Sequence, residues 1–434
     1  MLIFVDQVTE RLRYTFDFVF KQHGHAYEFT NDRSVFSTST QTRLNYSEFP
    51  FEGIPQLIPS PLLFSEQIDS KITIKQSPWN GCDCFSINEF MDPFASIFYV
   101  IVRYEEYVIQ KRDKHDRFQA IDSLLYQFGW LQQQIVERWV ETIFNTYLPT
   151  EIDQLKAIRS VTVIPSFDID NTYAFKWKAG WRKWISIMKD TVSRNKTRLK
   201  LRSEVNDGSK IDPYDTFKQI EAISKVYLNT RIFWLLGDYA EYDRNISWRD
   251  PRHQRLIRLM KQVATIGLHP SYGSNYSDKK LFEERTRINQ ITETKIVESR
   301  QHFLKVNLPQ TYRRLIAEGF KKDYSMGLAD QPGFRLGTAH PVYFFDLELN
   351  QATDYKLVPF VYMDGTFNEY LNYSVEESKP IVQHLANEVK QFGGVFCFIW
   401  HNETIGNTGK WIGWSVLLAY TLTLFDDESS STVS

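Results

Sequence analysis

The second half of the chain alternates short apolar runs with longer stretches in which apolar residues recur every three or four positions. The short runs predict buried β-strands, and the longer stretches predict amphipathic helices. The predicted strands cover residues 160–167, 231–237, 266–269, 299–304, 356–364 and 393–401, and the predicted helices lie near 214–226, 251–263, 309–319 and 376–392. Alternating strands and helices are typical of parallel β units, so we expect an α/β fold with a distorted (β/α) barrel of about seven strands over residues 151–425.

The first 150 residues follow a different pattern and are expected to form a smaller α/β domain of unknown role. Asp92 followed by Pro93 has the form of a helix N-terminus, and a second helix is predicted over 123–144. The charged residues Arg103, Glu105 and Glu106 are expected to form an ion-pair network between the domains. The uncharged run 411–425 is shorter than the roughly 20 residues that span a bilayer, so it predicts a buried C-terminal helix, and 426–434 is expected to be a disordered tail.

Composition narrows the class of protein. Hydrophobic residues make up 42% and charged residues 24% of the 434 residues, which is typical of a folded globular chain. A net charge of −2 gives no overall field that recruits nucleic acid. Three cysteines are too few for a disulfide framework, and no signal-peptide pattern is found, so a cytoplasmic location is expected. Aromatic residues at 15% permit stacking on a sugar without requiring it.

Two acids close the first predicted strand of the second half. Asp168 and Asp170 are separated by one residue, so strand alternation places both carboxylates on the same side. Neighbouring carboxylates are costly unless a cation or a shared proton relieves their repulsion. A turn or helix-capping pair is the ordinary alternative.

Histidines and an arginine stand at the ends of three further predicted strands. His269 ends one strand, Arg300 and His302 share a face of the next, and His401 ends the most apolar one. Each of these histidines taken alone is more often a hydrogen-bonded structural residue. Together with the two acids, they favour metal-assisted hydrolysis at the barrel mouth.

The motifs FDID, LHPSY, SRQHF and IWHNE occur in this order and resemble those of the polysaccharide deacetylases, or carbohydrate esterase family four, and within it a branch common in Bacteroidetes. The resemblance covers about residues 158–420, and QTYRRLIAEGFKKDYSMG continues it. The segments DPFASIFYVIVRYEEY and DKHDRF resemble an N-terminal domain of unknown role that accompanies this branch. The resemblance implies metal-dependent removal of an N-acetyl group from a sugar in a surface-polysaccharide or lipid-linked precursor.

The resemblance also implies roles for single residues. It makes Asp168 the general base that deprotonates a water activated by a divalent metal, expected to be zinc, and Asp170 and His269 ligands of that metal. Arg300 is implied to orient the base, and His401 to act as the general acid that protonates the departing amine. Contacts to the substrate are expected from Tyr272, Asp364 and Arg335.

The sequence departs from the family pattern at three places. Ile169 separates acids that are usually adjacent, so the roles of Asp168 and Asp170 could be exchanged. Gly273 stands where the second histidine is usual, and the arginine motif continues as RQHFL. We therefore expect His302 to supply the third ligand, because catalytic zinc normally has three. Two alternatives stay open, a degenerate metal-free carbohydrate-binding protein and an amidohydrolase acting on a non-sugar amide.

Residues 176–202 hold ten Lys or Arg against one acid and include three tryptophans, Trp177, Trp181 and Trp184. A solvated helical surface is the ordinary interpretation. The alternative is a peripheral contact with an anionic membrane, where lipid-linked sugars are found. Asp243 and Asn245 are expected in a loop near the barrel mouth. Oligomeric state has no signal in the sequence.

Overall fold

A computed structural model of the chain describes residues 1–178, 188 and 196–426. Most of the basic tract 176–202, including Trp181 and Trp184, lies outside the described residues, and so does nearly all of the expected tail. No helix within the described ranges is both long enough and apolar enough to cross a bilayer.

The second half of the chain is built around one curled sheet of nine strands. In spatial order these are β13 (Val342–Asp346), β14 (Gln351–Leu357), β12 (Lys322–Asp323), β11 (Glu298–Ser299), β10 (Thr265–Leu268), β9 (Arg231–Trp234), β8 (Val161–Ile169), β16 (Gly394–His401) and β15 (Tyr362–Met363). All neighbours are parallel except β13 and β14. The mixed α/β class was predicted correctly. The closed barrel of about seven strands is not confirmed, because no strand pairing joins β13 to β15 in the described part of the chain.

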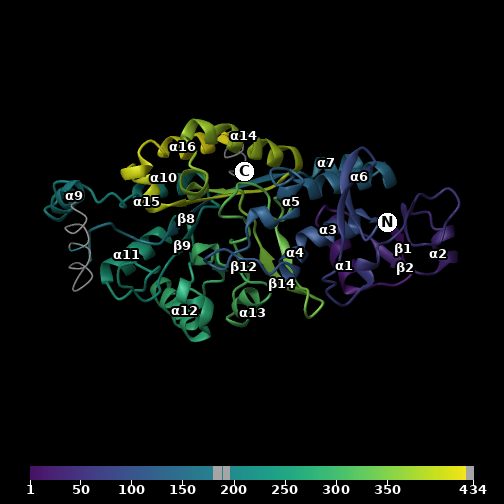
Figure 1. Ribbon diagram of the computed structural model, residues 1–434, viewed down its shortest axis with the longest axis horizontal. Helices are drawn as coiled ribbons and strands as arrows, with labels where there is room; N and C mark the ends of the chain where they lie inside the picture. The colour runs from purple at the N-terminus through teal and green to yellow at the C-terminus, as the bar shows by residue number, and fades with distance from the viewer. Residues whose placement is uncertain (179–187, 189–195, 427–434) are drawn as a thin grey trace.

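Helices cover this sheet on both sides (Figure 1). In the upper part of the figure lie α10 (Phe217–Val226), α14 (Val375–Phe392) and α16 (Ser415–Thr423). To the left of the strands lies α11 (Pro251–Met260), and below them lie α12 (Asp278–Thr292) and α13 (Gln310–Ala317). A capping box between Ser374 and Glu377 fixes the start of α14. The helices predicted near 214–226, 251–263, 309–319 and 376–392 are therefore confirmed, and α16 lies within the predicted C-terminal helix. Further left in Figure 1 lies α9 (Lys196–Asn206).

Two predicted strands were wrong in ways that matter for the site. The strand predicted over 299–304 ends at Ser299, and His302–Leu304 forms a 3₁₀ turn instead. The apolar run 356–364 is divided between the end of β14, the second strand from one edge of the sheet, and the short β15 at the other edge. Periodicity could not separate these cases, because the buried residues of the turns are as apolar as those of the strands.

The N-terminal region contains two smaller sheets. A parallel sheet has the order β2 (Glu28–Thr30), β1 (Leu2–Phe4), β3 (Arg43–Tyr46) and β4 (Gln56–Leu57), and an antiparallel sheet is formed by β5 (Ile74–Trp79), β6 (Cys82–Ile87) and β7 (Phe90–Met91). The helices around them are α1 (Glu10–Phe16), α2 (Arg33–Thr38), α3 (Pro93–Ile101), α4 (Tyr104–Val108), α5 (Leu124–Gln127), α6 (Ile135–Tyr147) and α7 (Ile152–Ala157). Asp92 caps α3 as predicted. The helix predicted over 123–144 is broken, since Gly129 with φ +72° lies between α5 and α6.

Buried ion pairs join this region to the large sheet. Arg103 donates to Glu105 at 2.6 Å and to Glu106 at 2.7 Å, which confirms the predicted network. The network extends to the second half of the chain through Arg335, whose guanidinium donates to both oxygens of Glu106 at 2.6 and 2.9 Å. A separate pair joins Arg138 on α6 to Glu388 on α14 at 2.6 Å.

Candidate functional site

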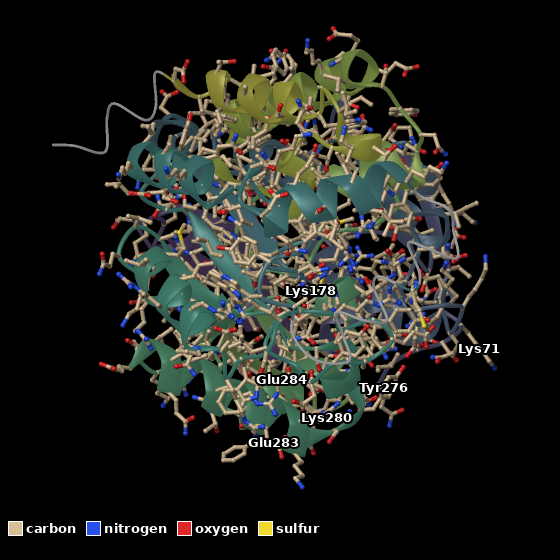
Figure 2. All side chains as sticks on the ribbon, turned by 90° about the vertical axis from the view of Figure 1, so that its left-hand side faces the viewer. Lys71, Lys178, Tyr276, Lys280, Glu283 and Glu284 are labelled. Carbon is tan, nitrogen blue, oxygen red and sulfur yellow. The ribbon has the colours of Figure 1, made fainter. Side chains whose placement is uncertain are left out.

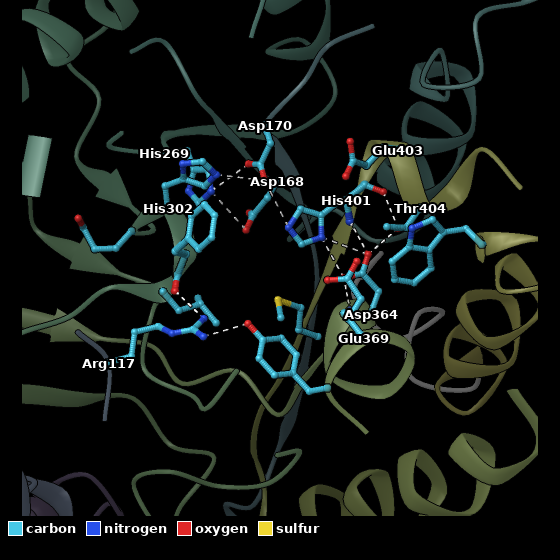
Figure 3. Close-up of a pocket in the computed structure, with 17 residues that line it drawn as sticks. Arg117, Asp168, Asp170, His269, His302, Asp364, Glu369, His401, Glu403 and Thr404 are labelled. Carbon is cyan, nitrogen blue, oxygen red and sulfur yellow. Dashed lines mark hydrogen bonds and ion pairs between the residues drawn. The ribbon is translucent and has the colours of Figure 1, made fainter. Parts of the chain in front are cut away.

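A pocket of about 230 Å³ opens at the carboxyl ends of the central strands (Figure 3). Loops that follow parallel strands meet at this edge of a sheet, so residues far apart in sequence can converge there. Six of the nine predicted site residues line the pocket: Asp168, Asp170, His269, His302, Asp364 and His401. The others are Arg300, buried directly behind it, and Tyr272 and Arg335, which do not line it.

Asp170, His269 and His302 converge on one point of the pocket wall. They follow β8, β10 and β11, which lie near one another in the sheet. Asp170 Oδ1 lies 3.1 Å from His269 Nε2, and Asp170 Oδ2 lies 3.3 Å from His302 Nε2. One potential ligand atom from each residue lies within 4.8 Å of the other two.

The outer nitrogen of each imidazole in this group is fixed by a hydrogen bond. His269 Nδ1 contacts the carbonyl oxygen of Arg300, and His302 Nδ1 lies 2.9 Å from Asp243 Oδ1. A carbonyl and a carboxylate oxygen can only accept, so both Nδ1 atoms carry the proton. In the neutral imidazoles the lone pairs therefore lie on Nε2 and face Asp170.

These residues fit a divalent metal ion. Zinc bonds of about 2.0–2.1 Å in a tetrahedral arrangement place ligand atoms about 3.3 Å apart. The separation of Asp170 Oδ1 from His269 Nε2 is 3.1 Å and that of Asp170 Oδ2 from His302 Nε2 is 3.3 Å, so each carboxylate oxygen lies at such a spacing from one imidazole. Asp170 Oδ1 is also buried without a hydrogen-bond partner among the described residues. Two imidazoles and a carboxylate with one open side are typical of catalytic zinc sites.

A second group of two histidines and a glutamate does not fit as well. His23 Nε2 lies 2.8 Å from Glu137 Oε2, which is a direct hydrogen bond, while His340 Nε2 lies 4.0 Å from the same oxygen. His340 Nε2 also contacts the carbonyl oxygen of Phe392 at 3.3 Å. This group is a hydrogen-bonded ion pair rather than a set of free ligands.

In the group of Asp170, His269 and His302, the charge of each side chain shifts the pKa of its neighbours. Burial raises the pKa of Asp170, but the imidazoles of His302 and His269 outweigh it and hold that pKa well below its usual value. Burial lowers the pKa of His302, and the carboxylates of Asp170 and Asp243 reverse this and raise it to about 10. The carboxylates therefore favour positive charge at this point of the pocket.

Asp168 lies beside this group and is held by Arg300. The Arg300 side chain is fully buried, its Nη1 donates to Asp168 Oδ1 at 2.8 Å, and its Nε donates to the carbonyl oxygen of Tyr324 at 2.9 Å. Asp168 Oδ2 lies 3.8 Å from His269 Nε2 and accepts no hydrogen bond within the described part of the chain. The guanidinium thus orients one carboxylate oxygen and leaves the other facing the pocket.

His401 faces the same pocket from β16, in register with Asp168 on β8. Its Nδ1 lies 2.9 Å from Asp364 Oδ1, and its backbone N–H donates to Asp364 Oδ2 at 2.8 Å. Burial lowers the pKa of His401, but the Asp364 carboxylate outweighs it and holds the pKa well above its usual value. Asp364 was expected to bind substrate, and it lines the pocket. Its Oδ1 lies against the His401 imidazole, and its Oδ2 accepts from the Thr404 hydroxyl.

Gly273, which stands where a second histidine was expected, lies in the loop after His269. The backbone N–H groups of Tyr272 and Gly273 donate to Asp243 at 2.9 and 3.3 Å, so the loop holds the carboxylate that fixes His302. Glu284 on α12 accepts from the Ser271 N–H at 2.8 Å and supports the loop from outside; Figure 2 shows this end of the molecule. Position 273 thus lies in a loop that holds Asp243, and the second histidine of the group with Asp170 and His269 comes instead from the segment after β11.

Several pocket residues had no assigned role in the sequence analysis. They are Arg117, Phe303, Glu369, Tyr370, Glu403 and Trp411. Burial raises the pKa of Glu403 to about 7, partly offset by His401. Glu403 belongs to the IWHNE motif and Arg117 to DKHDRF, so the motifs marked both segments without indicating that these side chains reach the pocket.

Comparisons with known proteins give the following matches. A family of unknown function, DUF7033, matches residues 1–148. No curated protein is significantly similar to the chain.

Three solved structures resemble part of the fold. A structure described as a candidate polysaccharide deacetylase from Mycobacterium smegmatis is 14% identical, with a TM-score of 0.38, and the match covers 63% of this chain and 91% of that one. The Puue allantoinase is 11% identical with a TM-score of 0.34, and a candidate polysaccharide deacetylase from Pseudomonas aeruginosa PAO1 is 10% identical with a TM-score of 0.36; each match covers 61% of this chain and 84% of the other. At such scores the likeness carries no argument about function.

Proposed function

We propose that this chain is a metal-dependent hydrolase that removes an N-acetyl group from a sugar. The observation that carries the proposal is the convergence of Asp170, His269 and His302, with both Nε2 atoms directed at the carboxylate. The order of the four motifs, which resembles that of polysaccharide deacetylases, supports the substrate class.

Asp170, His269 and His302 would hold the metal ion, zinc being the best fit. When bound, a divalent metal polarises the acyl carbonyl and makes water a better nucleophile. Asp168 takes the proton of the attacking water on its Oδ2, while Arg300 keeps Oδ1 in place. The roles of the two acids are not exchanged in this assignment, because only Asp170 lies within ligand distance of both histidines.

His401 returns a proton to the leaving amine. Its Nδ1 is held by Asp364, so Nε2 faces the pocket, 3.7 Å from Asp170 Oδ2. Asp168 and His401 are in register on neighbouring strands, so the base and the acid flank the same reacting group. One carboxylate and one imidazole thus handle the two proton transfers that amide hydrolysis needs.

The pocket walls fit a sugar. Phe303, Tyr370 and Trp411 offer aromatic surfaces for stacking, and Glu369 and Glu403 offer acceptors for hydroxyl groups. We place the substrate in a precursor of surface polysaccharide, free in the cytoplasm or linked to a membrane lipid. The competing proposals are hydrolysis of a non-sugar amide and metal-free sugar binding.

Acetate release distinguishes these proposals. Zinc-loaded protein is incubated with N-acetylglucosamine oligosaccharides and, in parallel, with a set of non-sugar acetamides, and Asp168→Asn serves as the inactive control. We expect acetate from the sugars and none above background from the control. Release from non-sugar amides alone favours the amidohydrolase, and sugar binding without any hydrolysis favours the binding protein.

A further inference from the structure

Segment 113–117 of the N-terminal region is hydrogen-bonded to segment 302–307, which follows β11. Arg117 Nη1 donates to the carbonyl oxygen of Phe303 at 3.1 Å. The Lys305 ammonium donates to the carbonyl oxygen of His115 at 3.1 Å and to Asp116 Oδ2 at 3.0 Å. Further along, Asn307 Nδ2 donates to Asp116 Oδ2 at 2.6 Å. Four hydrogen bonds therefore cross between the two regions over a few residues.

Segment 302–307 contains two residues in an unfavourable backbone conformation, which contacts from outside the segment must stabilise. Phe303 and Leu304, directly after His302, have φ of +62° and +55°. Side chains with a Cβ rarely adopt this left-handed region, and two in succession persist only where the surroundings hold them. His302 is the first residue of this turn, and its carbonyl oxygen accepts from the Lys305 N–H at 3.4 Å. The placement of its imidazole is therefore tied to the conformation of the turn.

Arg117 connects this turn to the opposite wall of the pocket. Its Nη2 donates to the Tyr370 hydroxyl at 3.0 Å, on the pocket side where Figure 3 labels Arg117. Its Nε donates to Asp113 Oδ2 at 2.8 Å. The His115 ring packs on Phe303 with centroids 4.7 Å apart. The planar guanidinium thus spans three partners that a shorter or non-planar cation could not reach together.

We propose that segment 113–117 is a positioning device for the metal site: it holds the 302–304 turn, and through it His302, in ligand geometry. The inference rests on the proposed function, because it assumes that His302 is a ligand. It gives the N-terminal region, matched only by a family of unknown function, a role in the chemistry of the large sheet. Arg117 is then a positioning residue that acts through the backbone of Phe303.

Metal titration of matched variants tests this. Zn²⁺ affinity is measured for the wild type, Arg117→Gln and Arg138→Gln. Arg138 is the control because its side chain also joins the N-terminal region to the large sheet, through an ion pair with Glu388 away from the pocket. Loss of a group that orients a ligand typically costs about 10 to 100-fold in metal affinity, and we expect that loss for Arg117→Gln. Arg138→Gln should bind as the wild type does. The visible spectrum of bound Co²⁺, which reports ligand geometry, should change only in Arg117→Gln.

Asp116→Asn provides a second variant if Arg117→Gln does not fold. Asp116 has φ +63°, which asparagine tolerates well, and the change removes the charge that faces Lys305. Weaker metal binding in this variant with an unchanged unfolding temperature supports the inference. Unchanged affinity and Co²⁺ spectra in both variants overturn it, and so does an equal loss in Arg138→Gln. A wild type that binds no metal instead overturns the proposed function.

Discussion

The Asp364 carboxylate contacts both the imidazole and the backbone of His401, so its replacement tests the assignment of the general acid. Asp364→Asn keeps the shape of the side chain and removes its charge. Nδ1 of His401 then loses a charged acceptor at 2.9 Å. Burial lowers the pKa of His401 and Asp364 is the largest influence raising it, so the proton-donating form becomes less populated.

The size of the effect follows from that one interaction. A hydrogen bond to a charged group contributes about 1.5–3 kcal/mol, and each 1.36 kcal/mol is about tenfold in rate, so kcat should fall by about 10 to 150-fold. His401→Gln should cost about 10² to 10⁴-fold, the usual contribution of a proton-transfer group. Because Asp364 acts through His401, adding Asp364→Asn to His401→Gln should cost little more.

The assay is acetate release at saturating substrate, with metal content measured on the same samples. Neither replacement should change metal content, since neither residue belongs to the Asp170, His269 and His302 group. Independent, multiplying losses in the double variant would refute the reasoning, because they would mean that Asp364 acts on something other than His401. Loss of metal in Asp364→Asn would refute it as well.

Three further predictions concern the base, the pH dependence of stability and the packing of the sheet. Asp168→Asn should retain metal, and its turnover should fall by about 10² to 10⁴-fold. If Asp168→Asn loses the metal while Asp170→Asn keeps it, the roles of the two acids are exchanged. Burial lowers the pKa of His253 to about 4, so the unfolded chain takes up its proton first, and unfolding free energy should fall by about 2 to 3 kcal/mol between pH 7 and pH 4.5. Denaturant unfolding of His253→Gln should lack this part of the decrease. Gly267→Ala places a Cβ 2.5 Å from the Phe233 ring, so the free energy of unfolding should fall by about 1–3 kcal/mol. Thermal unfolding measures this as a lower melting temperature, and an unchanged melting temperature would mean that the ring moves aside.

The convergence of the site could be predicted because of a property of parallel sheets. Asp170 and His269 directly follow strands whose apolar runs are plain in the sequence, and such strand ends meet at one edge. His302 was predicted on a false premise: the strand expected to carry it ends at Ser299. The left-handed turn that follows His302 is hydrogen-bonded to the N-terminal region, and contacts between residues so far apart in the chain leave no local sequence pattern.

Two residues expected to contact the substrate have interaction partners distant in the chain. Arg335 was expected near the substrate, but its guanidinium is buried against Glu106, 229 positions away in the chain, and does not line the pocket. Asp364 lines the pocket, and its carboxylate accepts from the His401 backbone N–H on β16 and from the Thr404 hydroxyl. Residue type and strand position indicated where charge would gather, and only tertiary contacts determined which charges pair.

Metal binding by the wild-type protein and by His302→Ala tests the central claim most directly. Elemental analysis after exposure to Zn²⁺ should find about one ion per chain, because Asp170, His269 and His302 offer one set of three ligands. His302→Ala removes a ligand itself, so its affinity should fall by much more than the roughly 10 to 100-fold of an outer hydrogen-bond partner. A wild type that takes up no metal, or a variant that binds it as tightly as the wild type, would contradict the account.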